Sequence, residues 1–225
     1  MKKIIAGLIC AMMILSLAAC SEENKTSSGS TKEKTTSAQE TKQNSDKSSD
    51  KKVLVTYFSG GNNSDADAVS SATPKVGDKY VTEYIASQIH DKVGGDLGPI
   101  IPEEAYPEGY NDTADKAKTE RDNGDRPKFT LNVNPEDYDV IFVGYPIWWY
   151  EMPMIMDTFF DSYDLSGKTI IPFNTHEGSG DGGTYDDIKE LEPKATVLDG
   201  YNTYGSSGKS EIDSGIKDWL NGIKY

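Results

Sequence analysis

From residue 51 onward, short runs of apolar and β-branched residues alternate with stretches whose apolar residues recur every three or four positions. The short runs predict strands at Val53–Phe58, Asp96–Ile101, Tyr138–Tyr145, Lys168–Phe173 and Ala195–Leu198. The first and third runs lack a regular polar alternation, which is typical of strands covered on both faces. The run at Tyr138–Tyr145 gives the strongest signal of the five.

The intervening stretches predict five helices. The first carries its apolar face at Tyr80, Val81, Tyr84, Ile85 and Ile89. A polar helix is predicted at Asp112–Arg121, and a third helix begins near Pro153, since proline is tolerated in a first turn. Thr184-Tyr185-Asp186-Asp187 resembles a capping box that opens a fourth helix. The apolar stripe of the last helix comprises Ile212, Ile216, Trp219, Leu220 and Ile223.

Five strands separated by helices predict an α/β fold, with a doubly wound parallel sheet, right-handed crossovers and helices on both faces. Open sheets of this kind bind ligands beyond the carboxyl ends of their strands. Three segments follow the first, third and fourth strands, and each is rich in glycine, hydroxyl or aromatic residues: Ser59 onward, Gly144–Trp149 and Asn174–Gly180. We therefore expect the functional site at this edge.

The first fifty residues have a different character. A basic start is followed by an apolar run at 4–17, which is shorter than the roughly 20 residues that span a bilayer. The run ends in Leu17-Ala18-Ala19-Cys20, which resembles the lipobox of bacterial lipoprotein signal peptides. Residues 1–19 are therefore predicted to be a signal peptide, with Cys20 acylated and the protein anchored to the cell membrane, facing the extracytoplasmic side. An ordinary secretory signal that contains a cysteine is the alternative.

Residues 20–50 continue as a polar segment of Ser, Thr, Lys, Glu, Gln, Asn and Asp, which predicts a disordered tether behind the lipidated cysteine. Residues 51–225 have the length of one domain. The second cysteine, Cys10, lies in the apolar run of the signal peptide, so residues 51–225 contain no cysteine for a disulfide or a thiolate ligand.

Charge separates the two parts further. Residues 1–50 hold seven Lys and six Asp or Glu, which leaves 16 basic and 31 acidic residues, a net charge of −15, for residues 51–225. This balance argues against nucleic-acid binding, which requires a basic face. A solvated acidic surface explains most of the charge, and an acidic face that docks a redox partner protein is also compatible with it.

Two segments carry a family resemblance: Tyr138-Asp139-Val140-Ile141-Phe142-Val143-Gly144-Tyr145-Pro146-Ile147-Trp148-Trp149 and Ile170-Ile171-Pro172-Phe173-Asn174-Thr175-His176-Glu177-Gly178-Ser179-Gly180. With these segments, residues 52–225 resemble the flavodoxin family, in its branch of larger flavodoxin-like proteins. Further points of similarity are Tyr106-Pro107, Tyr110, Glu120 and Arg126-Pro127. The resemblance implies a five-stranded sheet in the order 2-1-3-4-5 and FMN as the cofactor.

An FMN site needs phosphate donors at a helix N-terminus, a flat surface against the isoalloxazine ring, and backbone groups at the polar edge of the ring. The cofactor-binding residues implied are Ser59, Gly60, Asp78, Lys79, Tyr145, Pro146, Ile147, Trp148, Trp149, Thr175, His176, Glu177, Gly178, Ser179 and Gly180. Trp148 and Trp149 either face the ligand or pack beneath the following helix. His176 either bonds the ligand or structures its loop beside Glu177. The two histidines, His90 and His176, do not form a metal-binding pattern.

The first loop departs from the family pattern. Members of the family usually show Gly-Asn-Thr directly before the first helix, whereas here Ser59-Gly60-Gly61-Asn62-Asn63 is followed by an insertion through Thr73-Pro74. Asp78 or Lys79 then stands at the place of the threonine. A carboxylate there would repel a phosphate by about 1 kcal/mol through partly screened solvent, while Lys79 would offset that repulsion.

The resemblance implies an FMN-dependent redox protein that transfers electrons to a partner protein or reduces quinone-like small acceptors. Transient NAD(P)H binding is compatible, although the chain lacks a Gly-x-Gly-x-x-Gly fingerprint. We nominate no catalytic side chain. The alternative is a surface-displayed binding or scaffold protein that kept the fold and lost FMN, and the altered first loop favours it. A hydrolase is disfavoured because no Gly-x-Ser-x-Gly elbow is present.

Overall fold

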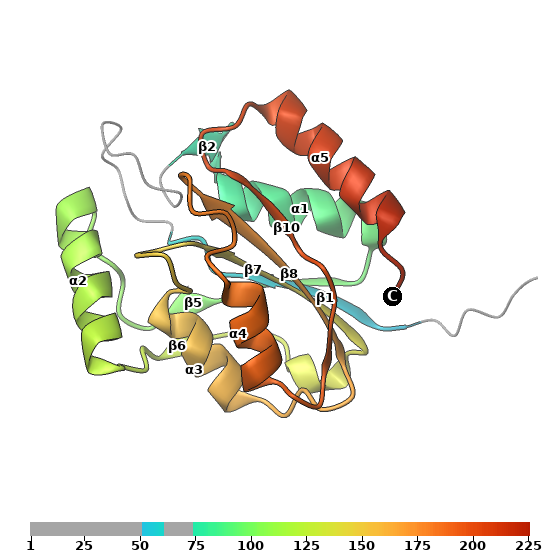
Figure 1. Cartoon of the computed structure of the whole chain (residues 1–225), viewed down its shortest axis with the longest axis horizontal. Coiled ribbons are helices and arrows are strands. Elements are labelled where there is room, and N and C mark those ends of the chain that lie inside the picture. Colours follow the sequence, from blue (N-terminus) through green and yellow to red (C-terminus); the bar gives the residue numbers. More distant parts are fainter. Residues whose placement is uncertain (1–50, 61–73) are drawn as a thin grey trace, which may run out of the picture. The chain divides into compact units, whose positions relative to one another are not determined.

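The computed structural model describes residues 51–60 and 74–225, and its centre is a parallel sheet (Figure 1). The strand β1 (Val53–Tyr57) lies between β4 (Asp96–Pro99) and β7 (Val140–Pro146). On the other side of β7, β8 (Thr169–His176) pairs with β10 (Tyr201–Tyr204). Taken in chain order, these five strands have the sheet order 2-1-3-4-5, which confirms the predicted fold. The predicted signal peptide and Cys20 lie outside the described residues.

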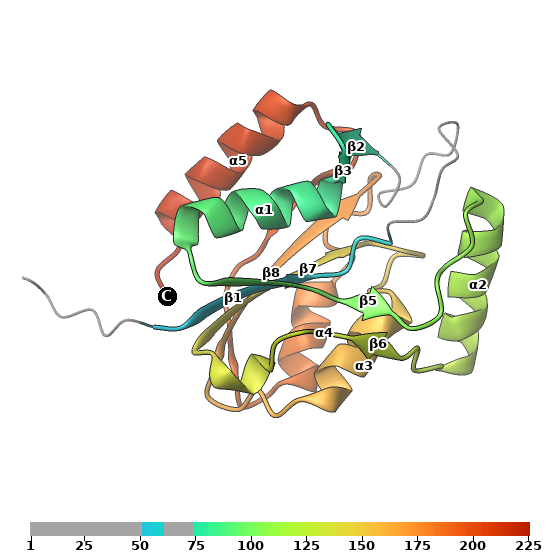
Figure 2. The same cartoon turned by 180° about the vertical axis from the view of Figure 1, so that it is seen from behind.

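Helices cover both faces of the sheet (Figures 1 and 2). One face is covered by α1 (Val81–Val93) and α5 (Lys209–Gly222), and the other by α3 (Met154–Ser162) and α4 (Thr184–Leu191). A hydrophobic core lies on each face of the sheet, and successive residues of β7 pack into opposite cores. Phe142 packs with the α1–α5 cluster and Ile141 with the α3–α4 cluster. Both faces are therefore apolar, which explains the continuous hydrophobic runs in the sequence.

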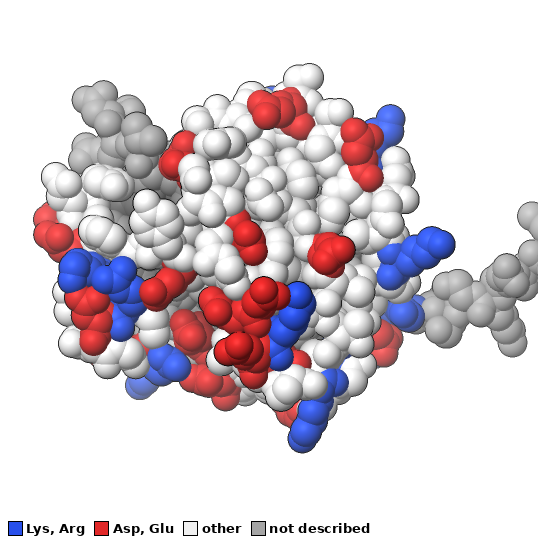
Figure 3. Space-filling model, in the orientation of Figure 1, with Lys and Arg blue, Asp and Glu red and all other residues white. Residues whose placement is uncertain are grey.

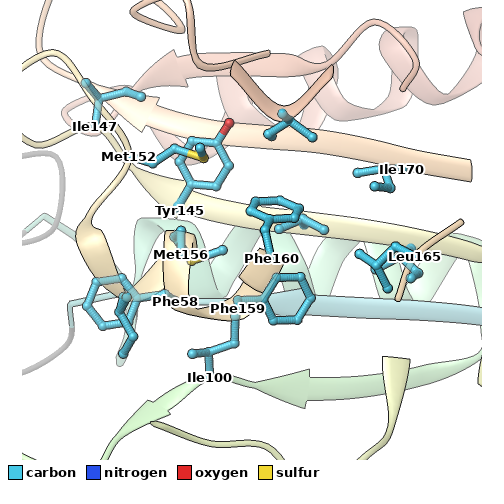
Figure 4. Packing of buried hydrophobic residues seen from close by; sticks show 14 of the residues in the cluster. Phe58, Ile100, Tyr145, Ile147, Met152, Met156, Phe159, Phe160, Leu165 and Ile170 are labelled. Atoms are coloured by element: carbon cyan, nitrogen blue, oxygen red, sulfur yellow. The ribbon is translucent and has the colours of Figure 1, made fainter. Parts of the chain in front are cut away.

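The core beneath α3 is rich in aromatic side chains (Figure 4). Phe159 and Phe160 are buried and meet edge to face, with ring centroids 5.2 Å apart. Tyr145 lies near them with its ring fully buried, and its hydroxyl shares a hydrogen bond of 2.9 Å with Thr184 Oγ1 at the start of α4. This hydrogen bond connects the end of β7 to the start of α4 within the core.

The predicted positions of the fifth strand and of the end of the fourth strand are wrong. The apolar residues near 195–198 form only a two-residue strand, β9 (Thr196–Val197), which pairs with the start of β8. The edge strand that pairs with the second half of β8 is β10. Its residues are alternately exposed and at least partly buried, so its sequence lacks an apolar run. Because β10 supports it, β8 extends three residues beyond the predicted end at Phe173.

A short hairpin, a second pair of two-residue strands and a peripheral helix complete the domain. The strands β2 (Lys75–Val76) and β3 (Lys79–Tyr80) form a hairpin directly before α1, and β5 (Ile101–Pro102) pairs with β6 (Phe129–Thr130). Between β5 and β6, α2 (Tyr110–Asn123) stands at the edge of the molecule (Figure 1). A 3₁₀ turn at Pro135–Asp137 precedes β7.

The predicted capping box at α4 is wrong, although the helix is present. Its N-cap is Gly183, and no side chain caps the helix. Thr184 is the first helical residue, and its hydroxyl donates to the Asp181 carbonyl at 2.7 Å. The left-handed conformation at Gly183, with φ of 87°, allows the preceding loop to turn into the helix without a side-chain cap. Within the described ranges, none of the helices is both long and apolar enough to cross a membrane.

Candidate functional site

The carboxyl ends of β1, β7 and β8 lie side by side, and the three segments singled out by the sequence begin there. The Phe58 N–H donates to the Gly144 carbonyl at 2.9 Å, so the chain after β1 follows β7. The Ile147 N–H donates to the Thr175 carbonyl at 2.8 Å, so the chain after β7 follows β8. A ligand at this edge would meet all three segments, as expected for a doubly wound sheet.

After β7 the chain makes a tight turn at residues 148–151. Trp148 and Glu151 exchange two backbone hydrogen bonds of 3.0 Å, which makes this a two-residue hairpin loop. Trp149 and Tyr150 have φ of 53° and 68°, and they are the only non-glycine residues of positive φ in residues 51–60 and 74–225. Positive φ at both central positions defines a type I′ turn, which normally selects Asn or Gly. Two large aromatic residues there store strain, a feature that clusters at ligand sites.

The two tryptophans have different environments. Trp148 is buried and packs edge to face on Phe58 and Tyr106, with ring centroids 5.5 Å and 5.1 Å away. Trp149 is 43% exposed, and its indole N–H donates to the Ala114 carbonyl of α2 at 3.0 Å. Trp148 therefore packs within the protein, whereas Trp149 and the more exposed Tyr150 present flat aromatic surface at this edge.

The end of β8 holds His176 and Glu177. Thr175 and His176 are strand residues rather than loop residues, and both are buried. His176 Nδ1 accepts the Gly178 N–H at 3.0 Å, so the neutral ring carries its proton on Nε2. The ring lies 4.6 Å from that of Tyr204 on β10. One carboxylate oxygen of Glu177 accepts from Ser206, while Oε1 is buried and lacks a partner among the described residues.

The loop after β8 is rich in glycine and lies against the turn after β7. Gly178, Gly180, Gly182 and Gly183 all have positive φ, a conformation that side chains rarely adopt. A Cβ at Gly182 would lie 2.5 Å from the Tyr150 carbonyl oxygen, so the loops approach too closely for any side chain. Ser179 lies among these glycines and is half-buried. The loop thus brings backbone groups, rather than side chains, to the site.

A hydrogen-bond network beneath the loop fixes its position. Asn174 Nδ2 donates to the Gly180 carbonyl at 3.0 Å, and Asn174 Oδ1 accepts from the Tyr185 hydroxyl at 2.6 Å. Thr82 and Thr175 share a hydrogen bond of 2.9 Å that joins α1 to β8. Burial raises the pKa of Tyr185 far above its ordinary value, which keeps its hydroxyl a donor.

The described part of the first loop is less favourable for an anion. Ser59 is half-buried, and Gly60 is buried with φ of 67°. Asp78 is exposed in the β2–β3 turn, two residues before the N-cap Tyr80 of α1. Lys79 extends along α1, where its Nζ donates to Ser87 Oγ at 2.7 Å. Side-chain capping of α1 is absent at Tyr80, and the Val81 N–H already donates to the Pro74 carbonyl.

A buried pair beside Trp148, Tyr106 and Glu120, was not among the predicted site residues. The Tyr106 hydroxyl donates to Glu120 Oε2 at 2.8 Å, and both residues are more than nine-tenths buried. Burial raises the pKa of Glu120, while the hydrogen bond from Tyr106 opposes that rise. Glu120 lies in a helix of mostly polar residues, so only the family resemblance drew attention to it. Metal ligands do not cluster anywhere in the described part of the chain.

The fold and these three loops define a doubly wound α/β protein with a candidate site for a planar ligand at the carboxyl edge of its sheet. The family model described as flavodoxin matches residues 52–223, and the chain belongs to this family. No curated protein matches the chain.

Solved structures share the fold. A candidate flavoprotein from Bacteroides eggerthii DSM 20697 is 29% identical, covers 77% of this chain and 99% of its own, and superposes with a TM-score of 0.58. The corresponding values for a candidate flavoprotein from Bacteroides uniformis ATCC 8492 are 26%, 76%, 98% and 0.60. A flavoprotein from Lactobacillus acidophilus NCFM, solved in complex with FMN, is 20% identical over 73% of this chain and 98% of its own, with a TM-score of 0.53.

Proposed function

We propose that this protein is a membrane-anchored, extracytoplasmic FMN-binding redox protein that transfers electrons to a partner protein or reduces quinone-like small acceptors. Membership in the flavodoxin family and the fold shared with a flavoprotein solved with FMN support FMN as its cofactor. The observation that carries the proposal is the strained aromatic turn at 148–151, held against the glycine-rich loop after β8.

The residues present fit the ring of FMN. Trp149 and Tyr150 would supply aromatic surface, and the backbone N–H groups near Gly178–Gly180 would meet the polar edge of the ring. Glu177 Oε1, which is buried and has no partner in the described part of the chain, is an acceptor at the start of the same loop. The flavin supplies the electron-transfer chemistry, while the protein orients it and limits solvent access.

Among the described residues, fewer hydrogen-bond donors are available for the phosphate of FMN than for its ring. Ser59 and the N-terminus of α1 would hold the phosphate, since helix N-termini favour anions. Asp78 before the helix and Glu83 in its first turn place negative charge at the same end. We therefore expect the ring to contribute more than the phosphate to affinity.

Titration of the full-length protein with FMN tests the proposal. Binding would quench flavin fluorescence at micromolar or lower concentrations, and riboflavin, which lacks the phosphate, would bind only a few-fold more weakly. A folded protein that leaves FMN fluorescence unchanged at 50 μM, a concentration of order 10 times the expected Kd, would refute the redox proposal.

Asp78→Thr is expected to tighten FMN binding about fivefold, because it removes a charge whose repulsion of the phosphate is worth about 1 kcal/mol. Asp91→Thr is the matched control, since it removes one carboxylate at the opposite end of α1. It should leave the FMN Kd within about twofold. Equal Kd values for Asp78→Thr and the wild type would place the phosphate away from Asp78.

The competing proposal is a flavodoxin-fold binding protein without FMN. It is favoured by the first loop, where the family's threonine is replaced and Lys79 is bonded to Ser87 instead of facing the helix N-terminus. The FMN titration separates the two proposals. A reductase would also oxidise NAD(P)H in the presence of FMN and a quinone, whereas an electron carrier would accept electrons only from a partner reductase.

The membrane anchor is a proposal from the sequence. Fractionation of cells that express the full-length chain tests it, because acylated Cys20 would carry the protein into the membrane pellet. Cys20→Ser should release it to the soluble fraction or leave an uncleaved precursor. A wild-type protein that is wholly soluble would contradict the anchor.

A further inference from the structure

The helix α2 contributes few buried side chains to the core. Only Thr113, Ala117 and Glu120 of its fourteen residues are buried. A helix held by so little apolar area depends on specific contacts for its position. Two of these contacts reach the tryptophans at the start of the turn after β7.

The first contact runs from Glu120 through Tyr106 to Trp148. The Tyr106 hydroxyl donates to Glu120 at 2.8 Å, and the ring of Tyr106 lies 5.1 Å from that of Trp148 at an interplanar angle of 78°. Phe58, directly after β1, closes a triangle with both rings, at 5.6 Å from Tyr106 and 5.5 Å from Trp148. Edge-to-face packing depends on ring orientation, so the hydroxyl that fixes Tyr106 also restricts Trp148.

The second contact holds Trp149. Its indole N–H donates to the Ala114 carbonyl at 3.0 Å, and the Arg121 guanidinium lies over its ring at 5.6 Å. Both tryptophans of the turn are therefore attached to α2, Trp148 through Tyr106 and Glu120, and Trp149 through Ala114 and Arg121.

The surroundings of the Tyr106–Glu120 pair restrict it further. Lys116 Nζ lies 5.1 Å from the centre of the Tyr106 ring and pairs with Glu104 at 2.9 Å. Glu120 also lines a surface cleft of about 660 Å³, together with Lys116, Thr119 and Arg126. Glu120 thus lies between the aromatic cluster and the cleft.

We propose that Tyr106 and Glu120 are positioning residues of the candidate FMN site, which act through Trp148 and do not touch the ligand. The effect on FMN rests on the proposed function above. The effect on Trp148 itself does not, because the Tyr106–Trp148 contact is present without a ligand. A small displacement of Trp148 would move the turn that presents Trp149 and Tyr150.

Tyr106→Phe tests the proposal, and Tyr138→Phe is its matched control. Both tyrosines are buried, and each donates one hydroxyl hydrogen bond to a carboxylate, Tyr106 to Glu120 at 2.8 Å and Tyr138 to Asp96 at 2.7 Å. Tyr138 lies before β7, at the opposite end of the sheet from the site. We expect Tyr106→Phe to raise the FMN Kd about tenfold and Tyr138→Phe to change it less than about twofold.

Two substitutions of Glu120 test whether its hydrogen bond with Tyr106 is what matters. In Glu120→Gln the amide oxygen still accepts from Tyr106, so the FMN Kd should stay within about threefold of wild type. In Glu120→Ala the acceptor is lost, and the Kd should rise about tenfold, as in Tyr106→Phe. A rise of equal size in both Glu120 variants would contradict positioning through this hydrogen bond.

Near-ultraviolet circular dichroism of the ligand-free, full-length protein gives a second readout. Tyr106→Phe should change the tryptophan bands, and Tyr138→Phe should leave them intact at equal helix content. Unchanged tryptophan bands in Tyr106→Phe, or equal losses of FMN affinity in the two Phe variants, would overturn the inference. If the wild type binds no FMN, the proposed function fails, while the dichroism comparison still decides whether Tyr106 positions Trp148.

Discussion

Gly144 lies in β7 opposite Phe173 of β8, and the absence of a side chain there makes room for the phenyl ring. A Cβ at this position would lie 2.1 Å from Phe173 Cζ, and the ring is fully buried, so it has little space to withdraw. The close fit joins the two central strands just before both enter the site. The glycine is therefore required by packing rather than by its backbone conformation.

Gly144→Ala is expected to lower the free energy of unfolding by about 1–3 kcal/mol through overpacking. Urea denaturation measures the loss. Gly222→Ala is the control, because nothing lies within 4 Å of a Cβ at that position, and it should change the stability by less than about 0.5 kcal/mol. A Gly144→Ala variant as stable as the wild type would show that Phe173 moves freely.

Glu192, just after α4, is a buried carboxyl group whose charge is unfavourable. Burial, and secondarily the nearby Asp164, raises its pKa from 4.5 to about 6. Below pH 4.5 the group is protonated in both the folded and the unfolded state and has no effect on stability. Between pH 4.5 and 6 the unfolded state ionises first, so the charge destabilises the fold increasingly, and fully above pH 6.

Glu192→Gln removes the charge and keeps the shape, so it should raise the thermal midpoint at pH 7.5 but not at pH 4. One pKa unit corresponds to about 1.4 kcal/mol, and solvent at the open side of the group reduces the gain to about 1 kcal/mol. That gain is a rise of about 2–4 °C for a domain of this size. Calorimetry at both pH values measures it, and a gain that is equal at pH 4 and pH 7.5 would exclude titration of Glu192 as the cause.

At the scale of elements, the turn at 148–151 is the least relaxed part of the described backbone. Its two central residues are large and exposed, and both adopt the left-handed conformation, which costs about 1 kcal/mol or more per residue. The hydrogen bond from Trp149 to α2 and the close approach of Gly182 hold it in place. The turn therefore lowers the stability of the protein, and it exposes aromatic surface at the candidate site.

Tyr150→Gly should stabilise the protein by about 0.5–1 kcal/mol, since glycine adopts this conformation without strain. Tyr150→Ala is the matched control, because it removes the same ring and keeps the strain. It should not raise the thermal midpoint. FMN affinity should fall in both variants if the ring contacts the flavin, and stabilisation of equal size in both would show that the ring, not the backbone, is unfavourable.

At the scale of the whole molecule, acidic charge dominates the surface. Residues 51–225 carry a net charge of −15, and Figure 3 shows Asp and Glu side chains gathered over the region of α3 and α4. Burial chiefly, with the nearby acidic Glu190, Asp186 and Asp181 adding to it, raises the pKa of Asp187 in α4. Such self-repulsion opposes the compact state.

Salt should therefore stabilise this protein. Raising NaCl from 10 to 300 mM, which shortens the Debye length from about 30 Å to below 8 Å, is expected to raise the thermal midpoint by a few degrees. Screening also weakens the surface ion pairs, but each contributes little. Choline chloride at equal ionic strength should give the same rise. A fall in the midpoint with salt would show that ion pairs outweigh the repulsion.

The helices α1, α3 and α5 could be predicted because their apolar residues recur at helical spacing, and the central strands because they form continuous apolar runs. The fifth strand could not, since β10 is polar and forms only where β8 offers its free edge. The β2–β3 hairpin was missed because each strand has only two residues, too few to show a pattern. The role of Tyr106 and Glu120 depended on a contact between segments that the sequence does not reveal.

The sequence by itself determined the alternation of the first four sheet strands with their helices, the cysteine-free acidic domain and the three loops at the carboxyl edge, because hydrophobic patterning and glycine content are local properties. Only the tertiary structure decided that Trp148 is buried while Trp149 is exposed, and that α2 holds both. Adjacent residues in a strand or turn point in different directions, and which one meets solvent depends on the segments that pack against them.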